Sequence, residues 1–182
     1  MKPLILLLSL FSGVILAQNS YLSLGVDVAI PNNNFKALAT TGFGGSLRYE
    51  YTITPRFSIT GTVHVDSFGK KVYASPPYKY TFKTSLISYK VGGRFYLFNI
   101  GNKADGLFLS GELGLATLGL TVSGDISDKS SENDFCYAPG IGYRYEFLEF
   151  CYWQQFVSSS SGNSTNFSGF RLAYVLKLKK PG

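Results

Sequence analysis

The sequence predicts an all-β fold, an eight-stranded antiparallel up-and-down transmembrane β-barrel, on three observations. Apolar residues alternate with small or polar residues in eight separate segments. No long apolar run follows the first 17 of the 182 residues, although 45% of the chain is hydrophobic, so helical membrane spans are not expected. Long polar connections alternate with short turns, as they do in barrels whose strands cross a membrane up and down.

The clearest alternation runs from Phe43 to Phe68, in two halves on either side of Pro55, and predicts a β-hairpin. One face is aromatic or aliphatic apart from two glycines. The other face is small, polar or charged and includes Arg48, Glu50, His64 and Asp66. A soluble sheet would present larger solvated residues on its polar face. Small residues and charges fit the narrow interior of a closed barrel instead, with the apolar face in lipid.

The same alternation places the remaining strands at 21–30, 82–97, 106–120, 135–146, 149–156 and 167–178. We expect a bulge or kink at Pro139, which lacks a backbone donor. A tight turn at Phe147 and Leu148 should join strands six and seven. The long connections then follow strands one, three, five and seven, and both termini fall on the periplasmic side. Aromatic residues should mark both membrane interfaces, with Phe68 at the upper one.

Residues 1–17 have the features of a cleaved signal peptide for the general secretory route, and residues 18–182 form the predicted barrel domain. Lys2 supplies the basic start, an apolar stretch follows from Leu4 to Leu16, and the small residue Ala17 ends it. The mature chain is therefore expected to begin at Gln18.

The charge pattern argues against nucleic-acid binding, and the cysteine positions argue against a disulfide. The net charge of +6 is scattered and forms no basic stripe of the kind that binds nucleic acid. Cys136 and Cys151 are both predicted to face the lumen, opposite Ser159 and Arg144 respectively. That register puts them too far apart for a disulfide.

Four stretches carry a family resemblance: GFGGSLRYEY at 42–51, RFSITGTV at 56–63, YAPGIGYRYEF at 137–147 and FRLAY at 170–174. With them the chain resembles the small eight-stranded outer-membrane barrels typified by the OmpA transmembrane domain and OmpX, particularly the Bacteroidota type. The resemblance covers nearly all of the mature chain. It implies a location in the Gram-negative cell outer membrane, contact with outer-membrane lipid, and roles in adhesion or structural support.

The lumen face carries a balanced set of charges that we expect to form a structural ion-pair network. Its candidate members are Arg48, Glu50, Arg94, Glu112, Arg144, Glu146, Glu149, Arg171 and Lys177. The expected register sets Glu146 opposite Glu149, with Lys177 opposite Glu149 from strand eight. Glu112 is expected to meet Arg94 or Arg144.

The predicted function is that of a closed, monomeric outer-membrane barrel that acts structurally or through surface loops that bind an extracellular partner. The candidate loop contacts are Lys70, Lys71, Tyr73, Tyr78, Lys79 and Tyr80. A narrow channel for small solutes is the alternative. A lipid-modifying enzyme built on His64, Asp66 and Ser67 is less favoured, because Ser67 should point away from His64. Acidic residues in 121–134 lack the order of a calcium loop, so no metal or other cofactor is predicted.

Overall fold

The computed structural model describes residues 20–75, 78–98, 105–124, 128–158 and 165–178. The predicted signal peptide lies outside these residues. The strands are Ser20–Asn32 (β1), Thr40–Thr54 (β2), Phe57–Gly69 (β3), Lys71–Ser75 (β4), Tyr78–Tyr96 (β5), Gly106–Gly124 (β6), Asp128–Tyr145 (β7), Leu148–Ser158 (β8) and Thr165–Leu178 (β9), with one 3-10 helix, Asn33–Ala37 (η1). In the described part of the chain no helix has the length and apolar character needed to cross a membrane.

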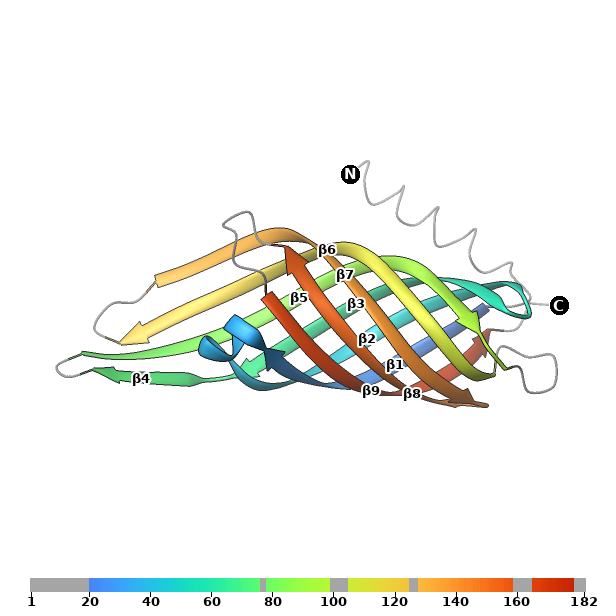
Figure 1. The fold of residues 1–182 in the computed structure, drawn as a ribbon, viewed down its shortest axis with the longest axis horizontal. Helices are drawn as coiled ribbons and strands as arrows, with labels where there is room; N and C mark the ends of the chain where they lie inside the picture. The colour runs from blue at the N-terminus through green and yellow to red at the C-terminus, as the bar shows by residue number, and fades with distance from the viewer. Residues whose placement is uncertain (1–19, 76–77, 99–104, 125–127, 159–164, 179–182) are drawn as a thin grey trace.

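The sheet closes on itself as a barrel (Figure 1). Consecutive strands pair antiparallel, except that β3 pairs with β5 and not with β4. Strand β1 also pairs with β9 over its whole length, from Ser20 opposite Leu178 to Asn32 opposite Asn166. The short strand β4 pairs with β5 beyond the point where the β3–β5 pairing ends. Strands β3 and β4 therefore follow one another along the same edge of β5 and count as one strand of the wall. The predicted eight-stranded barrel is confirmed.

Side chains alternate between lumen and outer surface as the sequence predicts. On the β2–β3 hairpin, Arg48 and His64 are buried in the lumen, whereas Phe43, Leu47 and Ile59 are exposed on the outside. Successive Cβ atoms of a strand point to opposite faces, so every second residue faces the lumen and the residues between them face the outer surface. Most large apolar side chains thus cover the outer wall, where a membrane protein meets lipid.

The two ends of the barrel differ in how far their strands project. At one end, here called the short-turn end, lie the first residue of β1, the last of β9 and the turns that join β2 to β3 and β7 to β8 (Figure 1). At the other, the long-hairpin end, hairpins β4–β5 and β6–β7 project beyond β8 and β9 (Figure 1). Residues Asp128–Asp134 pair only with β6, because β8 joins β7 from Phe135 onward.

Several local expectations were wrong. Much of 70–80 and 121–134 was expected to be loop and is strand, because polar residues on both faces suit a sheet that rises out of lipid. Pairing is interrupted beside Pro139, yet the register is the same before and after it, so the predicted bulge is absent from the described strand. Phe68 is buried at the barrel mouth and not at the membrane interface.

Close approach of neighbouring strands explains one lumen-facing glycine. Gly114 on β6 lies opposite Lys90, and a Cβ added there would overlap the carbonyl oxygen of Tyr89 on β5. Gly111, three residues earlier on the same strand, faces outward, and an added Cβ would meet no atom within 4 Å. The lumen therefore requires a glycine at position 114, whereas the outer wall has room at 111.

We predict that Gly114→Ala destabilises the barrel by about 1–3 kcal/mol, the usual cost of forcing an extra group into a filled interior. Gly111→Ala is the matched control and should change stability by less than about 0.5 kcal/mol. Urea unfolding of the refolded protein in lipid vesicles measures both. Equal effects of the two substitutions would show that the close approach at Gly114 carries no energetic weight.

Candidate functional site

The lumen contains buried charges arranged in layers, the first of which lies toward the short-turn end. Arg94 Nη1 donates to Glu50 Oε2 at 2.9 Å and to Glu149 Oε2 at 2.6 Å, and Arg94 Nη2 donates to Glu149 Oε1 at 2.7 Å. Arg144 Nη2 donates to the same two carboxylates, at 2.5 and 2.9 Å. Two acids and two guanidinium groups therefore neutralise one another with charge-assisted hydrogen bonds.

Aromatic side chains enclose this four-membered ion-pair layer. Tyr96 Oη donates to Glu50 Oε1 at 2.8 Å, which satisfies a further acceptor. The guanidinium of Arg94 lies 4.2 Å from the ring centre of Phe108, and that of Arg144 lies 5.1 Å from the ring of Tyr21. Burial of these charges is tolerated because each has both an ionic partner and hydrogen bonds.

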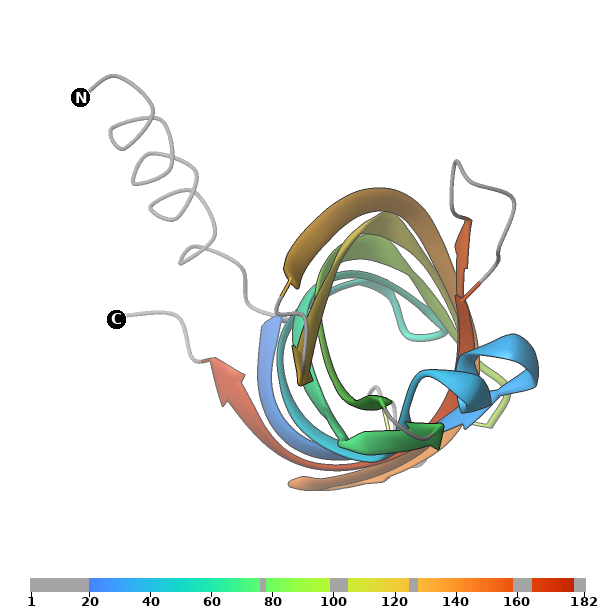
Figure 2. The ribbon, with the colours of Figure 1, turned by 90° about the vertical axis from the view of Figure 1, so that its left-hand side faces the viewer.

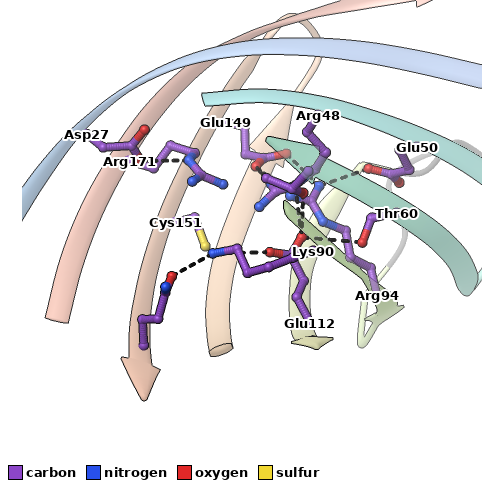
Figure 3. Close-up of polar contacts among 12 residues, drawn as sticks. Asp27, Arg48, Glu50, Thr60, Lys90, Arg94, Glu112, Glu149, Cys151 and Arg171 are labelled. Carbon is purple, nitrogen blue, oxygen red and sulfur yellow. Dashed lines mark hydrogen bonds and ion pairs between the residues drawn. The ribbon is translucent and has the colours of Figure 1, made fainter. Parts of the chain in front are cut away.

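Arg48 connects the first layer to a second one at mid-height. Its Nη1 donates to Glu149 Oε1 at 2.9 Å, and its Nε lies 3.3 Å from Glu112 Oε1. Thr62 donates to the same Glu112 oxygen at 2.7 Å, and Lys90 Nζ lies 3.9 Å from the other one. Figure 3 shows Arg48, Lys90, Glu112 and Glu149 reaching into the lumen from several strands and converging there.

A third layer follows toward the long-hairpin end. Arg171 Nε donates to Asp27 Oδ1 at 2.7 Å, and these two side chains lie apart from the central cluster in Figure 3. His64 Nε2 lies 3.4 Å from Asp27 Oδ2 and 3.3 Å from Asp66 Oδ1. The imidazole meets the ring of Trp153 edge to face, with 4.9 Å between the ring centres.

An aromatic plug closes the lumen above these charges. Phe35, from helix η1, packs edge to face on Phe68 with ring centres 4.9 Å apart, and Phe68 packs on Phe167 at 5.4 Å. Phe167 in turn contacts Trp153 at 5.3 Å. All four rings are at most 4% exposed. In Figure 2, which faces the long-hairpin end, η1 lies at the rim of the ring of strands.

The structure places seven of the nine predicted lumen charges inside the barrel and two outside. Glu146 is exposed in the β7–β8 turn, with a positive φ of 53°, because the turn occupies 146–147 and not 147–148. Lys177 is also exposed, since it pairs with Tyr21 at the short-turn rim. Arg144 consequently lies opposite Glu149, where the expected register had Glu146.

Two further register expectations were wrong. Glu112 contacts Arg48 and Lys90, and neither Arg94 nor Arg144 lies within ion-pair distance of it among the described residues. Cys151 lies opposite Gly142, and Cys136 lies opposite Val157. Both cysteines are free and buried. In the described segments no three His, Cys, Asp or Glu side chains are placed to hold a metal ion.

The plug was missed by the sequence analysis. Phe35 stood in a segment expected to be loop, and its only signal was a single aromatic residue in the polar run Asn32–Lys36. The ammonium of Lys71 donates to the carbonyl oxygen of Lys36, which ties η1 to the β4 strand. The first connection is therefore a packed cover on the barrel mouth.

The predicted loop contacts lie on the β4–β5 hairpin. Lys70 is exposed, Lys71 is half-buried, and Tyr73 pairs across the hairpin with Tyr80. The side chains of Tyr73, Tyr78 and Lys79 lie outside the described part of the structure.

Comparison with known proteins identifies the family. The model of the outer membrane protein beta-barrel domain matches residues 4–149, most of the chain. The chain belongs to this family. It is thus an outer-membrane protein, as its apolar outer wall requires. No curated protein sequence matches it.

Solved structures show the same barrel at low sequence identity. Ail, the attachment invasion locus protein of Yersinia pestis, superposes with a TM-score of 0.65 at 14% identity, covering 88% of this chain and 100% of that one. The N-terminal β-barrel domain of Pseudomonas aeruginosa OprF gives 0.61 at 14% identity, over 87% of this chain and 98% of that one. Ail in complex with the heparin analogue sucrose octasulfate gives 0.61 at 14% identity, over 86% and 97%. At such identities the likeness shows the fold.

The first charge layer generates a stability prediction. Glu149→Gln removes the carboxylate shared by Arg48, Arg94 and Arg144, and we expect a loss of about 3–5 kcal/mol because buried guanidinium groups lose their counter-charge. Glu146→Gln, three residues away and exposed, is the control and should change stability by less than about 0.5 kcal/mol. Urea unfolding in lipid vesicles compares them. A Glu149→Gln barrel as stable as the control would contradict the role assigned to this layer.

Proposed function

We propose that this protein is a closed outer-membrane scaffold that binds an anionic extracellular ligand through its long-hairpin end. The observation that carries the proposal is the filling of the lumen: ion pairs occupy its lower and middle levels, and an aromatic plug occupies its mouth. An eight-stranded barrel has an interior just wide enough for its own side chains. The surface, and not the lumen, is therefore the part of the molecule available to a partner.

The long-hairpin end offers cationic groups for such a partner. Lys36 on η1, Lys70 before β4 and Lys83 on β5 are exposed, and Lys71 lies beside Lys36. Ammonium groups on flexible stems attract sulfate and carboxylate groups through long-range electrostatics. Ail provides a precedent in a barrel of the same fold, since it has been crystallised with a sulfated saccharide.

The proposed function includes no enzymatic step. His64 is fully buried in the lumen, whereas Ser67 is exposed on the outer face of the same strand. A hydroxyl on the opposite face of a strand cannot donate its proton to that imidazole, so the pair does not form a nucleophile and base.

The proposal predicts that removal of the β4–β5 hairpin abolishes ligand binding and leaves the barrel intact. Ser67 pairs with Ser85, and continuing that register places Gly69 opposite Lys83. Joining these two residues through Asn-Gly should make a two-residue hairpin and remove all six candidate contacts. Binding of a heparin oligosaccharide to the refolded protein in lipid nanodiscs is the measurement, and heat-modifiable gel mobility reports the fold.

A charge variant separates electrostatics from shape. Lys70→Gln with Lys71→Gln should weaken heparin binding about tenfold or more and reduce its dependence on salt. Lys129→Gln on the neighbouring hairpin is the matched control and should bind as the unaltered protein does. Unchanged binding in the double variant would rule out the hairpin as the contact. A stable single-channel conductance that changes with Glu112→Gln or Arg94→Gln would show that the lumen, as a narrow channel, is the working site.

A further inference from the structure

Strand β7 has one edge that no described strand covers. Residues 128–134 pair with β6 throughout. Strand β8 pairs with β7 only from Phe135 onward, so in the described part of the chain the other edge of 128–134 has no partner strand. Figure 1 shows the β6–β7 hairpin projecting beyond β8 and β9. An uncovered edge of this kind presents a row of backbone donors and acceptors that can pair with another strand.

Pro139 identifies which backbone groups point to that edge. The β6–β7 pairing runs through Pro139 without a break, whereas the β7–β8 pairing is interrupted there. Proline has no backbone N–H, so the hydrogen bond that is missing is one toward β8. Successive residues of an antiparallel strand turn their backbone groups alternately to the two neighbouring strands, so the odd-numbered residues of β7 face the β8 side. Lys129, Ser131 and Asn133 therefore carry the N–H and C=O groups of the uncovered edge.

The sheet beside this edge has the polarity of a water-exposed sheet. On β6, Leu118, Leu120 and Val122 continue the inward-facing row of the fully buried Ala116, and they are half-buried. The outward-facing residues of β7 between 129 and 133 are polar and exposed. In the lipid-facing wall below, the large apolar side chains point outward instead. A strand added at the β7 edge therefore extends a sheet with one apolar and one polar face, the pattern of sheets that meet water on one side.

The inward-facing row of β7 along this edge is acidic. It consists of Asp128, Ser130, Glu132 and Asp134, of which Asp128 and Glu132 are exposed and Asp134 is 9% exposed. None of the three carboxylates has an arginine or lysine within ion-pair distance in the described segments. Side chains directly opposite each other on one face of a sheet interact, and opposite charges stabilise the pairing of their strands. A strand that pairs here is therefore favoured by cations opposite these carboxylates.

We propose that the β7 edge at 128–134 binds an extended basic segment of another protein, which adds to the sheet as an antiparallel strand. The backbone of that segment pairs with the three odd-numbered residues, and its lysines or arginines, at alternate positions, lie opposite the three carboxylates. A second copy of this chain is a poorer occupant, because two β7 edges would bring their carboxylates together. The surface lies on a different hairpin from the cationic β4–β5 contacts and does not depend on the anionic ligand proposed above.

The probe is a synthetic seven-residue peptide with lysine at its odd positions and threonine at its even positions. When it binds the refolded protein in nanodiscs, amide hydrogen exchange should slow at Lys129, Ser131 and Asn133. The amides of Ser130 and Glu132 face β6 and should change little. N-methylation of the threonines, whose N–H groups face β7, should abolish binding, whereas N-methylation of the internal lysines should be tolerated. Unchanged exchange at the three edge amides, or equal binding of the two methylated peptides, would overturn the proposal.

Variants of the protein test the backbone and the charges separately. Ser131→Pro removes one N–H from the uncovered edge and leaves the pairing with β6, so it should weaken peptide binding about tenfold or more. Ser131→Ala keeps that N–H and is the matched control. Heat-modifiable gel mobility reports folding. Peptide binding that survives Ser131→Pro unchanged would contradict the strand addition, and so would dimerisation of the protein without peptide that Ser131→Pro prevents, since the occupant would then be a second copy.

The charge variant is Asp128→Asn combined with Glu132→Gln. It should weaken binding of the lysine peptide about fivefold or more and reduce the dependence of binding on salt. Glu146→Gln, exposed at the short-turn end, is the control and should bind the peptide as the unaltered protein does. Equal affinity of the charge variant and the control would show that the acidic row does not select the partner, and the proposal would fail.

Discussion

The structure depends on one constraint, which is that charges enclosed by a narrow barrel must neutralise one another inside it. The inward half of every strand points at a common axis, and eight strands leave room for side chains alone. Glu50 and Glu149 survive there because Arg94 and Arg144 each bind both of them. Arg48 then links that group to Glu112. Since these residues come from five different strands, the ion pairs hold together parts of the wall that share no backbone pairing.

The period of two in the sequence predicted which face each residue occupies far better than which residue it contacts. Moving the β7–β8 turn by one residue shifts every partner across the hairpin by two positions. Because a strand repeats every two residues, inward residues stay inward on both strands. Glu149 was therefore placed correctly in the lumen although its partner there is Arg144 and not Glu146. Glu112 shows the second limit: its contacts with Arg48 and Thr62 cross the lumen, and pairing along the wall does not encode them.

Segments outside the lipid were the hardest to predict. There the outer face of a strand no longer meets lipid, so apolar and polar residues need not alternate. Residues 128–133 form strand although they are exposed, and nothing in their order separates them from a loop. Phe35 is the opposite case, because it is a buried residue in a segment whose sequence shows no alternation of apolar and polar residues. Its position is fixed by Phe68 and by the tie between Lys71 and the backbone of Lys36, contacts between residues more than 30 positions apart. A single sequence carries little signal for contacts of that kind.

The layers of the lumen differ in the side chains that face their carboxylates. Guanidinium groups keep their charge at any physiological pH, so the two layers built on Arg48, Arg94 and Arg144 have a fixed electrostatic balance. The layer beneath the plug includes the one histidine of the chain, His64, which lies between Asp27 and Asp66. This layer lies below the mouth, near the helix that Lys71 ties down at the end with the cationic hairpin. His64 contacts Trp153, and Trp153 contacts Phe167, so the upper layer packs against the plug through aromatic rings, whereas the short-turn end is held by its arginines.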